Sequence, residues 1–332
     1  MSVIIRFHDP NRLALLEEAI FSLALQFWRD IELVVVIQNG TAAIEAQIAE
    51  LIEKQPWLGQ PLYKVLSLQF SPGFDGRSKL LNYGVQHAKG RYLAFLDDDD
   101  YVYQHGYRVL IESLNGNQQV LAAGKCRVSR SRKSNGHWHI YQKNSPFEWG
   151  RNLADLLFDN FIPIHSYVID RTRIAPEDLW FDEQLNLLED YDFLLRLVAK
   201  YRFDFSNLDN PVCEYRYHET NSLQPDLGLN PASTPKILQA RELIDARKNS
   251  LIISLTVLDL LQLRTELQVV VPTPILEPSI DKKLLIDLLT KQNRSLNKVV
   301  DKIYDFAHQH TGLISILVFC TRSVRKFLAA FR

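Results

Sequence analysis

Two clusters of acidic residues in this 332-residue chain have the composition that cation binding and proton transfer require. The first, residues 95–100 with the sequence FLDDDD, follows an apolar run and offers hard oxygen ligands for a divalent cation. The second, residues 188–192 with the sequence LEDYD, opens an apolar-periodic segment and can supply a general base. A cation-binding turn combined with a helix-borne carboxylate suits transfer from a phosphate-activated donor to a hydroxyl acceptor.

Both clusters also have plain structural explanations. Four consecutive aspartates repel one another and commonly form a solvated loop, and the helix dipole alone favours acids in the first turn of a helix. The first cluster is favoured as a site because it ends a predicted buried strand, where the side chains of Asp97 and Asp99 can point to the same side. Such a pair suits Mg²⁺ or Mn²⁺, with phosphate oxygens and waters completing the shell.

Strands and helices alternate from the beginning of the chain, and they determine where these acids lie. The β-branched run at 31–37 is typical of a parallel strand that is covered on both faces. The alternation predicts an α/β fold with a Rossmann-like, mostly parallel sheet flanked by helices. Ligands bind such sheets beyond the carboxyl ends of the strands, where Asp9, the Gln38-Asn39 pair and the aspartate run all fall. The predicted strands are residues 3–7, 31–37, 63–68 and 91–96, and the predicted helices follow Asp9-Pro10 and span residues 78–89.

The rest of the chain is less regular and changes character after residue 225. Three prolines there precede a helical run that reaches about residue 268, and residues 280–308 carry a second apolar stripe. We therefore expect a catalytic α/β domain at residues 1–225 and a helical extension at residues 226–332. Before that boundary, the further predicted strands are 120–128, 162–169 and 212–218, and the further predicted helices are 153–158 and 190–201.

Composition limits the class of protein. The formal net charge of −1 gives no reason to expect nucleic-acid binding. The cysteines, Cys126, Cys213 and Cys320, are odd in number and scattered without the spacing of a disulfide framework or a zinc site, which fits a reducing compartment. No basic leader precedes the strand at 3–7, and the longest apolar stretch, 313–320, is too short to span a bilayer. We therefore expect a cytoplasmic protein.

The C-terminal segment, residues 313–332, contains basic residues and no acids, and its apolar residues line one helical face. This composition suits an interfacial helix on an anionic membrane, which would place the protein at the inner face. A helix packed on its own domain explains the same pattern. The stripe at 280–308 also fits the seam of a homodimeric coiled coil, although it is short.

Several segments, taken in their order and spacing, resemble the family 2 glycosyltransferases, which are inverting nucleotide-sugar enzymes of the GT-A fold. The resemblance covers about residues 2–222 and implies transfer of a sugar from a nucleoside diphosphate donor to a hydroxyl of a glycan or a lipid-linked acceptor. Besides the opening strand, the segments that carry it are 76–84 (GRSKLLNYG), 90–100 (GRYLAFLDDDD), 181–183 (FDE), 189–192 (EDYD) and 215–218 (YRYH).

The resemblance also implies roles for single residues. Asp97 and Asp99 would bind the Mg²⁺ or Mn²⁺ ion, and His218 would be a third ligand unless it is an exposed histidine at a sheet edge. Asp190 would be the general base, with Glu189 as the neighbour most easily confused with it. The residues that would contact the donor are Phe7, Asp9, Gln38, Asn39, Arg77, Asp97 and Asp98.

The chain departs from the family pattern at three places. Gln38 and Asn39 replace a pair of aspartates, so the base of the donor is not implied, and the first loop has an unusual sequence at residues 6–9. Leu179-Trp180 replaces a glycine pair on the acceptor side, so the acceptor is not implied either. A catalytically silent relative that binds a glycan or acts as a scaffold is one alternative. A sugar nucleotidyltransferase is another, but residues 7–12 lack its glycine-rich phosphate loop.

Overall fold

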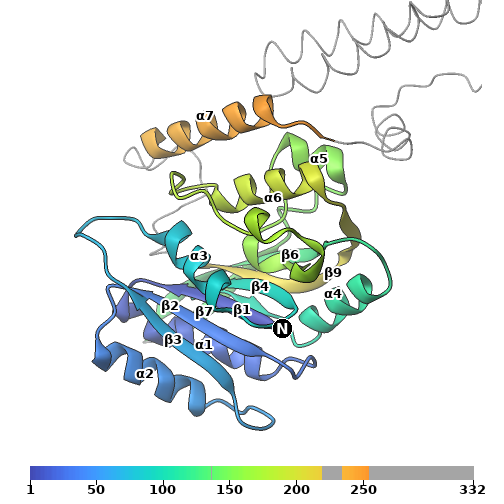
Figure 1. Ribbon diagram of the computed structural model, residues 1–332. Helices are drawn as coiled ribbons and strands as arrows, with labels where there is room; N and C mark the ends of the chain where they lie inside the picture. Colours follow the sequence, from blue (N-terminus) through green and yellow to red (C-terminus); the bar gives the residue numbers. More distant parts are fainter. Residues whose placement is uncertain (136, 219–233, 254–332) are drawn as a thin grey trace, which may run out of the picture. The chain divides into compact units, whose positions relative to one another are not determined.

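The computed structural model describes residues 1–135, 137–218 and 234–253 (Figure 1). The chain divides into two compact units, Met1–Ile244 and Asp245–Arg332. The strands of the described residues and the candidate site lie in the first unit.

Several sequence predictions fall outside the described residues. They are the boundary at 225–226, the stripe at 280–308 and the basic helix at 313–332, and all three stay predictions. Helix α7 (Thr234–Ser250) agrees with the first part of the predicted helical run. No helix in the described part of the chain is both long and apolar enough to cross a membrane.

The first half of the sheet is parallel, as predicted. Strand β1 pairs with β2 on one side and with β4 on the other, and β2 pairs with β3. Asp9 caps the first helical turn by accepting a hydrogen bond from the backbone N–H of Asn11. These elements are β1 (Ser2–Phe7), a 3₁₀ turn (Pro10–Arg12), α1 (Leu13–Ala24), β2 (Glu32–Gln38), α2 (Ala42–Glu53), β3 (Leu62–Leu68), α3 (Arg77–His87) and β4 (Tyr92–Asp97).

Helices cover both faces of this half, which explains why its strands read as continuous apolar runs. Ile5 and Val35 point to one face and join the core cluster formed with α1 and α2. Ile4 and Val36 point to the other face, against α3. A Cβ at Gly84 would lie 2.4 Å from Cγ2 of Ile4, so α3 approaches this closely because residue 84 has no side chain.

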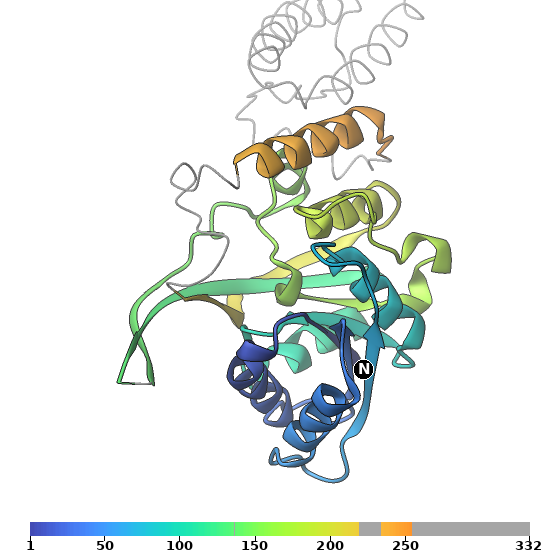
Figure 2. The same ribbon diagram turned by 90° about the vertical axis from the view of Figure 1, so that its left-hand side faces the viewer.

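Beyond β4 the sheet is mixed. Strand β8 is antiparallel to both β4 and β6, β9 is parallel to β6 with register shifts, and the short β5 is antiparallel to β9. Within the described residues the nine strands form one sheet in the order β3-β2-β1-β4-β8-β6-β9-β5, with β7 paired to β6. Figure 2 shows the β6–β7 hairpin extending away from the rest of the sheet. The elements are β5 (Tyr101–Val102), α4 (Gly106–Asn115), β6 (Leu121–Ser134), β7 (His137–Asn144), α5 (Leu153–Phe158), β8 (Tyr167–Asp170), α6 (Glu189–Lys200) and β9 (Phe203–His218).

The predicted bounds of two strands in this half were wrong. The strand predicted at 162–169 begins as a 3₁₀ turn, Ile164–Ser166, because both the N–H and the hydroxyl of Ser166 donate to the carbonyl of Pro163. Proline also has no N–H to offer to a strand ladder. The strand predicted at 212–218 is the end of the longer β9. The sequence analysis did not predict α2, α4 or β5.

Candidate active site

The aspartate run follows β4, beside the end of β1. Arg6 of β1 lies opposite Asp97 of β4 in the parallel register, and its Nε donates to Asp97 Oδ1 over 2.9 Å. Burial opposes ionisation of Asp97, but the adjacent guanidinium outweighs it and lowers the pKa of this carboxyl. Asp97 is therefore held in its charged form.

The same guanidinium reaches the second acidic cluster. Nη1 of Arg6 donates to Oε1 of Glu189 over 2.5 Å, at the start of α6. Burial would lower the pKa of Arg6, but its contacts with Asp97 and Glu189 raise it well above the ordinary value. Arg6 thus joins two clusters that are far apart in the chain, and both face one region at the carboxyl edge of the sheet.

Helix α3 holds the loop that delivers Glu189 to this position. The hydroxyl of Ser78 donates to the carbonyl of Leu185 over 2.8 Å. The Asn82 side-chain amide donates a hydrogen bond to the carbonyl of Phe181 over 2.9 Å and accepts one from the N–H of Phe181 over 2.6 Å. The loop ends at Leu188, whose φ of 60° lies in the left-handed region that a side chain disfavours. These anchors hold that backbone conformation directly before the helix begins.

Asp190 has different partners. The Asn160 side chain donates to its Oδ2 over 3.1 Å, and the backbone N–H of Tyr191 donates to its Oδ1 over 2.8 Å. Burial, and then repulsion from Glu189, raise the pKa of Asp190 to about 7. The residue is still partly exposed. It has the access and the proton affinity that a general base needs near neutral pH.

The next aspartates pair with a second arginine. Nη2 of Arg12 lies 2.9 Å from Asp98 Oδ1 and 2.6 Å from Asp99 Oδ2. Burial raises the pKa of Asp98 to about 8, and the pKa of Asp99 is raised for the same reason, although Arg12 opposes both shifts. Asp100 is 1% exposed and accepts a hydrogen bond from the backbone N–H of Arg216.

The donor set of this region fits a hard divalent cation. Carboxylate oxygens are the ligands that Mg²⁺ and Mn²⁺ prefer, and Asp98 Oδ2 is buried without a hydrogen-bond partner. Asp97, Asp100 and His165 each offer an atom within 4.8 Å of the others, whereas the predicted partner Asp99 is turned to Arg12.

His218, the predicted third metal ligand, lies at the end of a strand. It is the last residue of β9 and pairs with Ser131 of β6 in the parallel register. Its side chain lies outside the described residues. Its assignment as a third metal ligand therefore stays a prediction.

Gln38 and Asn39 both hold the loop that precedes α3. The Gln38 amide donates to the carbonyl of Phe74 over 2.7 Å and accepts from the N–H of Gly76 over 3.1 Å. Asn39, with a φ of 54°, accepts from the N–H of Phe70 over 2.6 Å. An amide can donate and accept at once, which a carboxylate cannot. The amide pair is therefore used to stabilise this loop.

The remaining predicted donor contacts occupy different environments. The Phe7 side chain is fully buried in the core, so a contact to a donor would come from its backbone. Asp9 is partly exposed at the turn after β1. Arg77 is partly exposed and pairs with Asp75, at 3.0 Å from Nη2 to Oδ2.

The sequence analysis did not identify the residues that contact the acidic clusters and link them to each other. Arg6 carried a usable signal, because it is a charge inside an otherwise apolar strand. Arg12, Asn160 and His165 carried none, because their contacts depend on segments that are distant in the sequence.

Comparison with known proteins supports this description. The family model described as Glycosyl transferase family 2 matches residues 2–170. The uncharacterized glycosyltransferase EpsJ of Bacillus subtilis is 27% identical over 184 residues, which cover 54% of this chain and 51% of that protein. The uncharacterized glycosyltransferase MJ1057 of Methanocaldococcus jannaschii is 22% identical, over 64% of this chain and 69% of that protein. The chain thus spans about half the length of EpsJ.

The fold also has a solved counterpart. The crystal structure of S. aureus TarS aligns with a TM-score of 0.50 at 16% identity, covering 76% of this chain and 41% of TarS. At this identity the likeness concerns the fold alone. It confirms the predicted GT-A type of α/β architecture.

Proposed function

Because the chain belongs to glycosyl transferase family 2, we propose that it is an inverting, cation-assisted glycosyltransferase. It moves a sugar from a nucleoside diphosphate donor to a hydroxyl group of a glycan or a lipid-linked acceptor. Asp190 is the general base, Asp97 and Asp99 are the cation ligands, and the donor lies along the carboxyl edge of the parallel half of the sheet.

One observation carries this proposal. The contacts from Asp97 to Arg6 and from Arg6 to Glu189 bring the end of β4 and the start of α6 to the same edge. A donor phosphate bound near Asp97 would then lie on the same side of the sheet as the carboxylate of Asp190. This arrangement supports an in-line reaction with the departing diphosphate on one side and the attacking hydroxyl on the other.

The choice of Asp190 over Glu189 as the general base follows from the groups that each carboxylate contacts. Glu189 is engaged by Arg6 in an ion pair. Asp190 has hydrogen bonds from an amide and from a backbone N–H, and its pKa is raised to about 7. It would accept the proton of the acceptor hydroxyl as the oxygen attacks the anomeric carbon. The new bond forms on the face opposite the departing diphosphate, which is an inversion.

A divalent cation held by Asp97 and Asp99 would offset the negative charge of the departing diphosphate. In the structure these carboxylates contact Arg6 and Arg12. The two arginines reduce the repulsion within the aspartate run in the absence of substrate. Arg12 would have to release Asp99 for it to bind a cation.

Exposed aromatic rings near Asp190 support a sugar-containing acceptor. Trp149 and Phe158 are 46% and 51% exposed, and their ring centroids lie 6.3 Å apart. Phe158 ends α5, two residues before Asn160, which contacts Asp190. A flat apolar ring beside polar groups suits the apolar face of a sugar.

The proposal is tested by calorimetry with uridine, guanosine, adenosine and cytidine diphosphates, each with and without Mn²⁺. We expect one nucleotide to bind at least about tenfold more tightly with Mn²⁺. Asp97→Asn should remove the enhancement. Asp209→Asn is a matched control, because that carboxylate is 84% exposed and lies in another ion pair.

The same experiment identifies a catalytically silent relative. Such a protein would bind no nucleoside diphosphate more tightly with Mn²⁺. Uniform weak binding of all four nucleotides in both conditions would contradict the proposal.

A further inference from the structure

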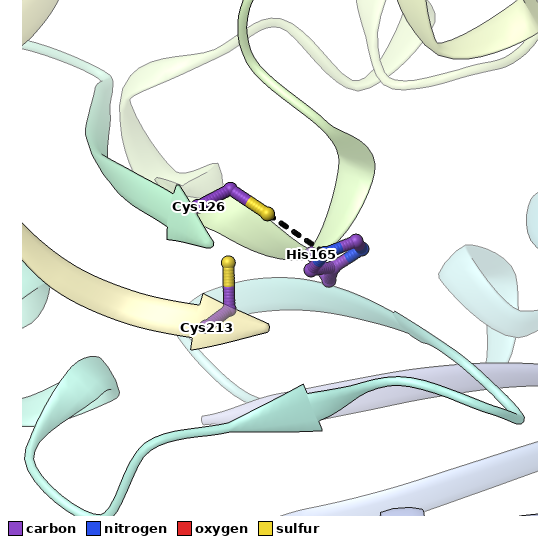
Figure 3. Close-up of side chains that lie close together, drawn as sticks. All are labelled: Cys126, His165 and Cys213. Carbon is purple, nitrogen blue, oxygen red and sulfur yellow. Dashed lines mark hydrogen bonds between the residues drawn. The ribbon is translucent and has the colours of Figure 1, made fainter. Parts of the chain in front are cut away.

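Two cysteines and a histidine meet in the mixed half of the sheet (Figure 3). Cys126 of β6 and Cys213 of β9 lie opposite each other in the parallel register. His165 comes from the 3₁₀ turn before β8. Their exposures are 2%, 0% and 2%, and one ligand atom from each lies within 4.8 Å of the other two.

We propose that Cys126, Cys213 and His165 form a second metal site, which binds a thiolate-seeking ion of the Zn²⁺ class. This site differs from the proposed Asp97 and Asp99 cation site, although His165 also lies near Asp97 and Asp100, and the inference does not depend on the proposed function.

The spacing of the ligand atoms agrees with tetrahedral coordination. Zn–S and Zn–N bonds of about 2.3 Å and 2.0 Å place a sulfur and a nitrogen roughly 3.5 Å apart around a tetrahedral ion. Cys126 Sγ and His165 Nε2 are 3.4 Å apart. Figure 3 shows this sulfur and the imidazole ring facing each other, with Cys213 on the adjacent strand.

The other side of the imidazole supplies a second, independent observation. Nδ1 of His165 lies 3.2 Å from Asp100 Oδ2, and the ring stacks on Tyr215 with centroids 5.8 Å apart. A histidine that binds a metal commonly has a carboxylate at its other nitrogen, which fixes the tautomer and the ring orientation. Nε2 is thereby left to face the two sulfurs.

The net charge of the site after binding decides which ion suits these buried residues. A divalent ion that displaces two thiol protons adds no net charge to the site. Thiolates favour Zn²⁺ over Mg²⁺ or Mn²⁺, so this site and the carboxylate site would select different ions.

The site would act on the aspartate run through Asp100. This carboxylate contacts His165 and accepts from the N–H of Arg216 over 2.6 Å. Arg216 Nε in turn donates to the carbonyl of Asp99 over 2.5 Å. A metal bound to His165 would therefore stabilise the turn that presents Asp97 and Asp99.

The test is the metal content of the full-length chain, produced with Zn²⁺ in the medium and dialysed against a chelator. Because the ligands are buried, we expect about one Zn²⁺ per chain to remain bound until the protein is unfolded. Cys126→Ser and Cys213→Ser should each reduce the content to below about a tenth of that value. Cys320→Ser, the remaining cysteine, is the matched control and should retain the metal.

A measurement on the unaltered chain keeps the proposal testable if the cysteine variants do not fold. The protein is unfolded with a chelator under reducing conditions and refolded with Co²⁺. A thiolate-to-cobalt charge-transfer absorption is expected. Folded native protein that retains no zinc and shows no such absorption would overturn the proposal, as would a Cys126→Ser variant with full metal content.

Discussion

Asp97 and Asp190 both feel the charge of Arg6 but have opposite shifts in pKa. The guanidinium contacts Asp97 directly and lowers its pKa. The guanidinium also contacts Glu189, whereas Asp190 accepts hydrogen bonds from the Asn160 amide and from the backbone N–H of Tyr191. Its pKa is raised to about 7 by burial and by Glu189.

This difference fits the roles proposed for Asp97 as a cation ligand and for Asp190 as the base. A carboxylate that stays ionised at every working pH suits a cation ligand, whereas one that titrates near neutrality suits a base. The position of the Arg6 guanidinium relative to the two carboxylates contributes to which one stays ionised and which one titrates near neutrality.

The largest effect should come from removing the base. Asp190→Asn should lower turnover by about 10²–10⁴-fold while leaving Mn²⁺-dependent binding of the nucleoside diphosphate unchanged, because the amide cannot accept the proton. Turnover and calorimetry on the same preparation measure both. Asp209→Asn is the control, and full turnover by Asp190→Asn would assign the base to another residue.

Removing the guanidinium should have the next largest effect. Arg6→Gln should lower the free energy of unfolding by about 3 kcal/mol at pH 7, because Glu189 would remain buried, and Asp97 partly buried, without this counter-charge. Urea unfolding measures the change. Arg151→Gln, which breaks an exposed ion pair, should cost less than about 1 kcal/mol. Equal losses for both variants would contradict a central role for Arg6.

The environment of Asp190 also predicts how stability depends on pH. Its folded-state pKa is raised, so its carboxyl favours folding most below pH 4, and that contribution is lost as the pH rises to about 7. Asp190→Asn should therefore become more stable than the original protein between pH 5 and pH 7, by about 2 kcal/mol, and the difference should level off above pH 7. Denaturant unfolding across this range tests the sign, and a constant difference would mean that Asp190 has an ordinary pKa.

The smallest effect concerns the amide partner of the base. Asn160 donates to Asp190 and favours its ionised form, so Asn160→Ala should raise the pKa of Asp190 further. We expect kcat/KM at pH 7 to fall a few-fold and its acidic limb to move to higher pH. A loss of activity without that displacement would indicate a purely structural role for Asn160.

How much could be predicted differs between the two halves of the sheet. In the parallel half, β1, β2 and β4 are buried on both faces and the edge strand β3 is partly buried, so apolar runs and the turns after them predicted these four strands. In the mixed half, β6 pairs in parallel with β9, about 80 residues away, through register shifts. Such pairings leave no local pattern, which is why the start of β9 and the turn before β8 were not predicted.

The sequence alone determined the architecture of the first half and the two acidic clusters, because periodicity and the end of a buried strand are local properties. Tertiary structure decided how the acids differ. Asp97 and Asp190 are the same residue type, and only the folded chain places Arg6 against one and Asn160 against the other. The same holds for Cys126, Cys213 and His165, whose spacing in the chain indicated no metal site, because the pairing of β6 with β9 and the turn before β8 bring them together.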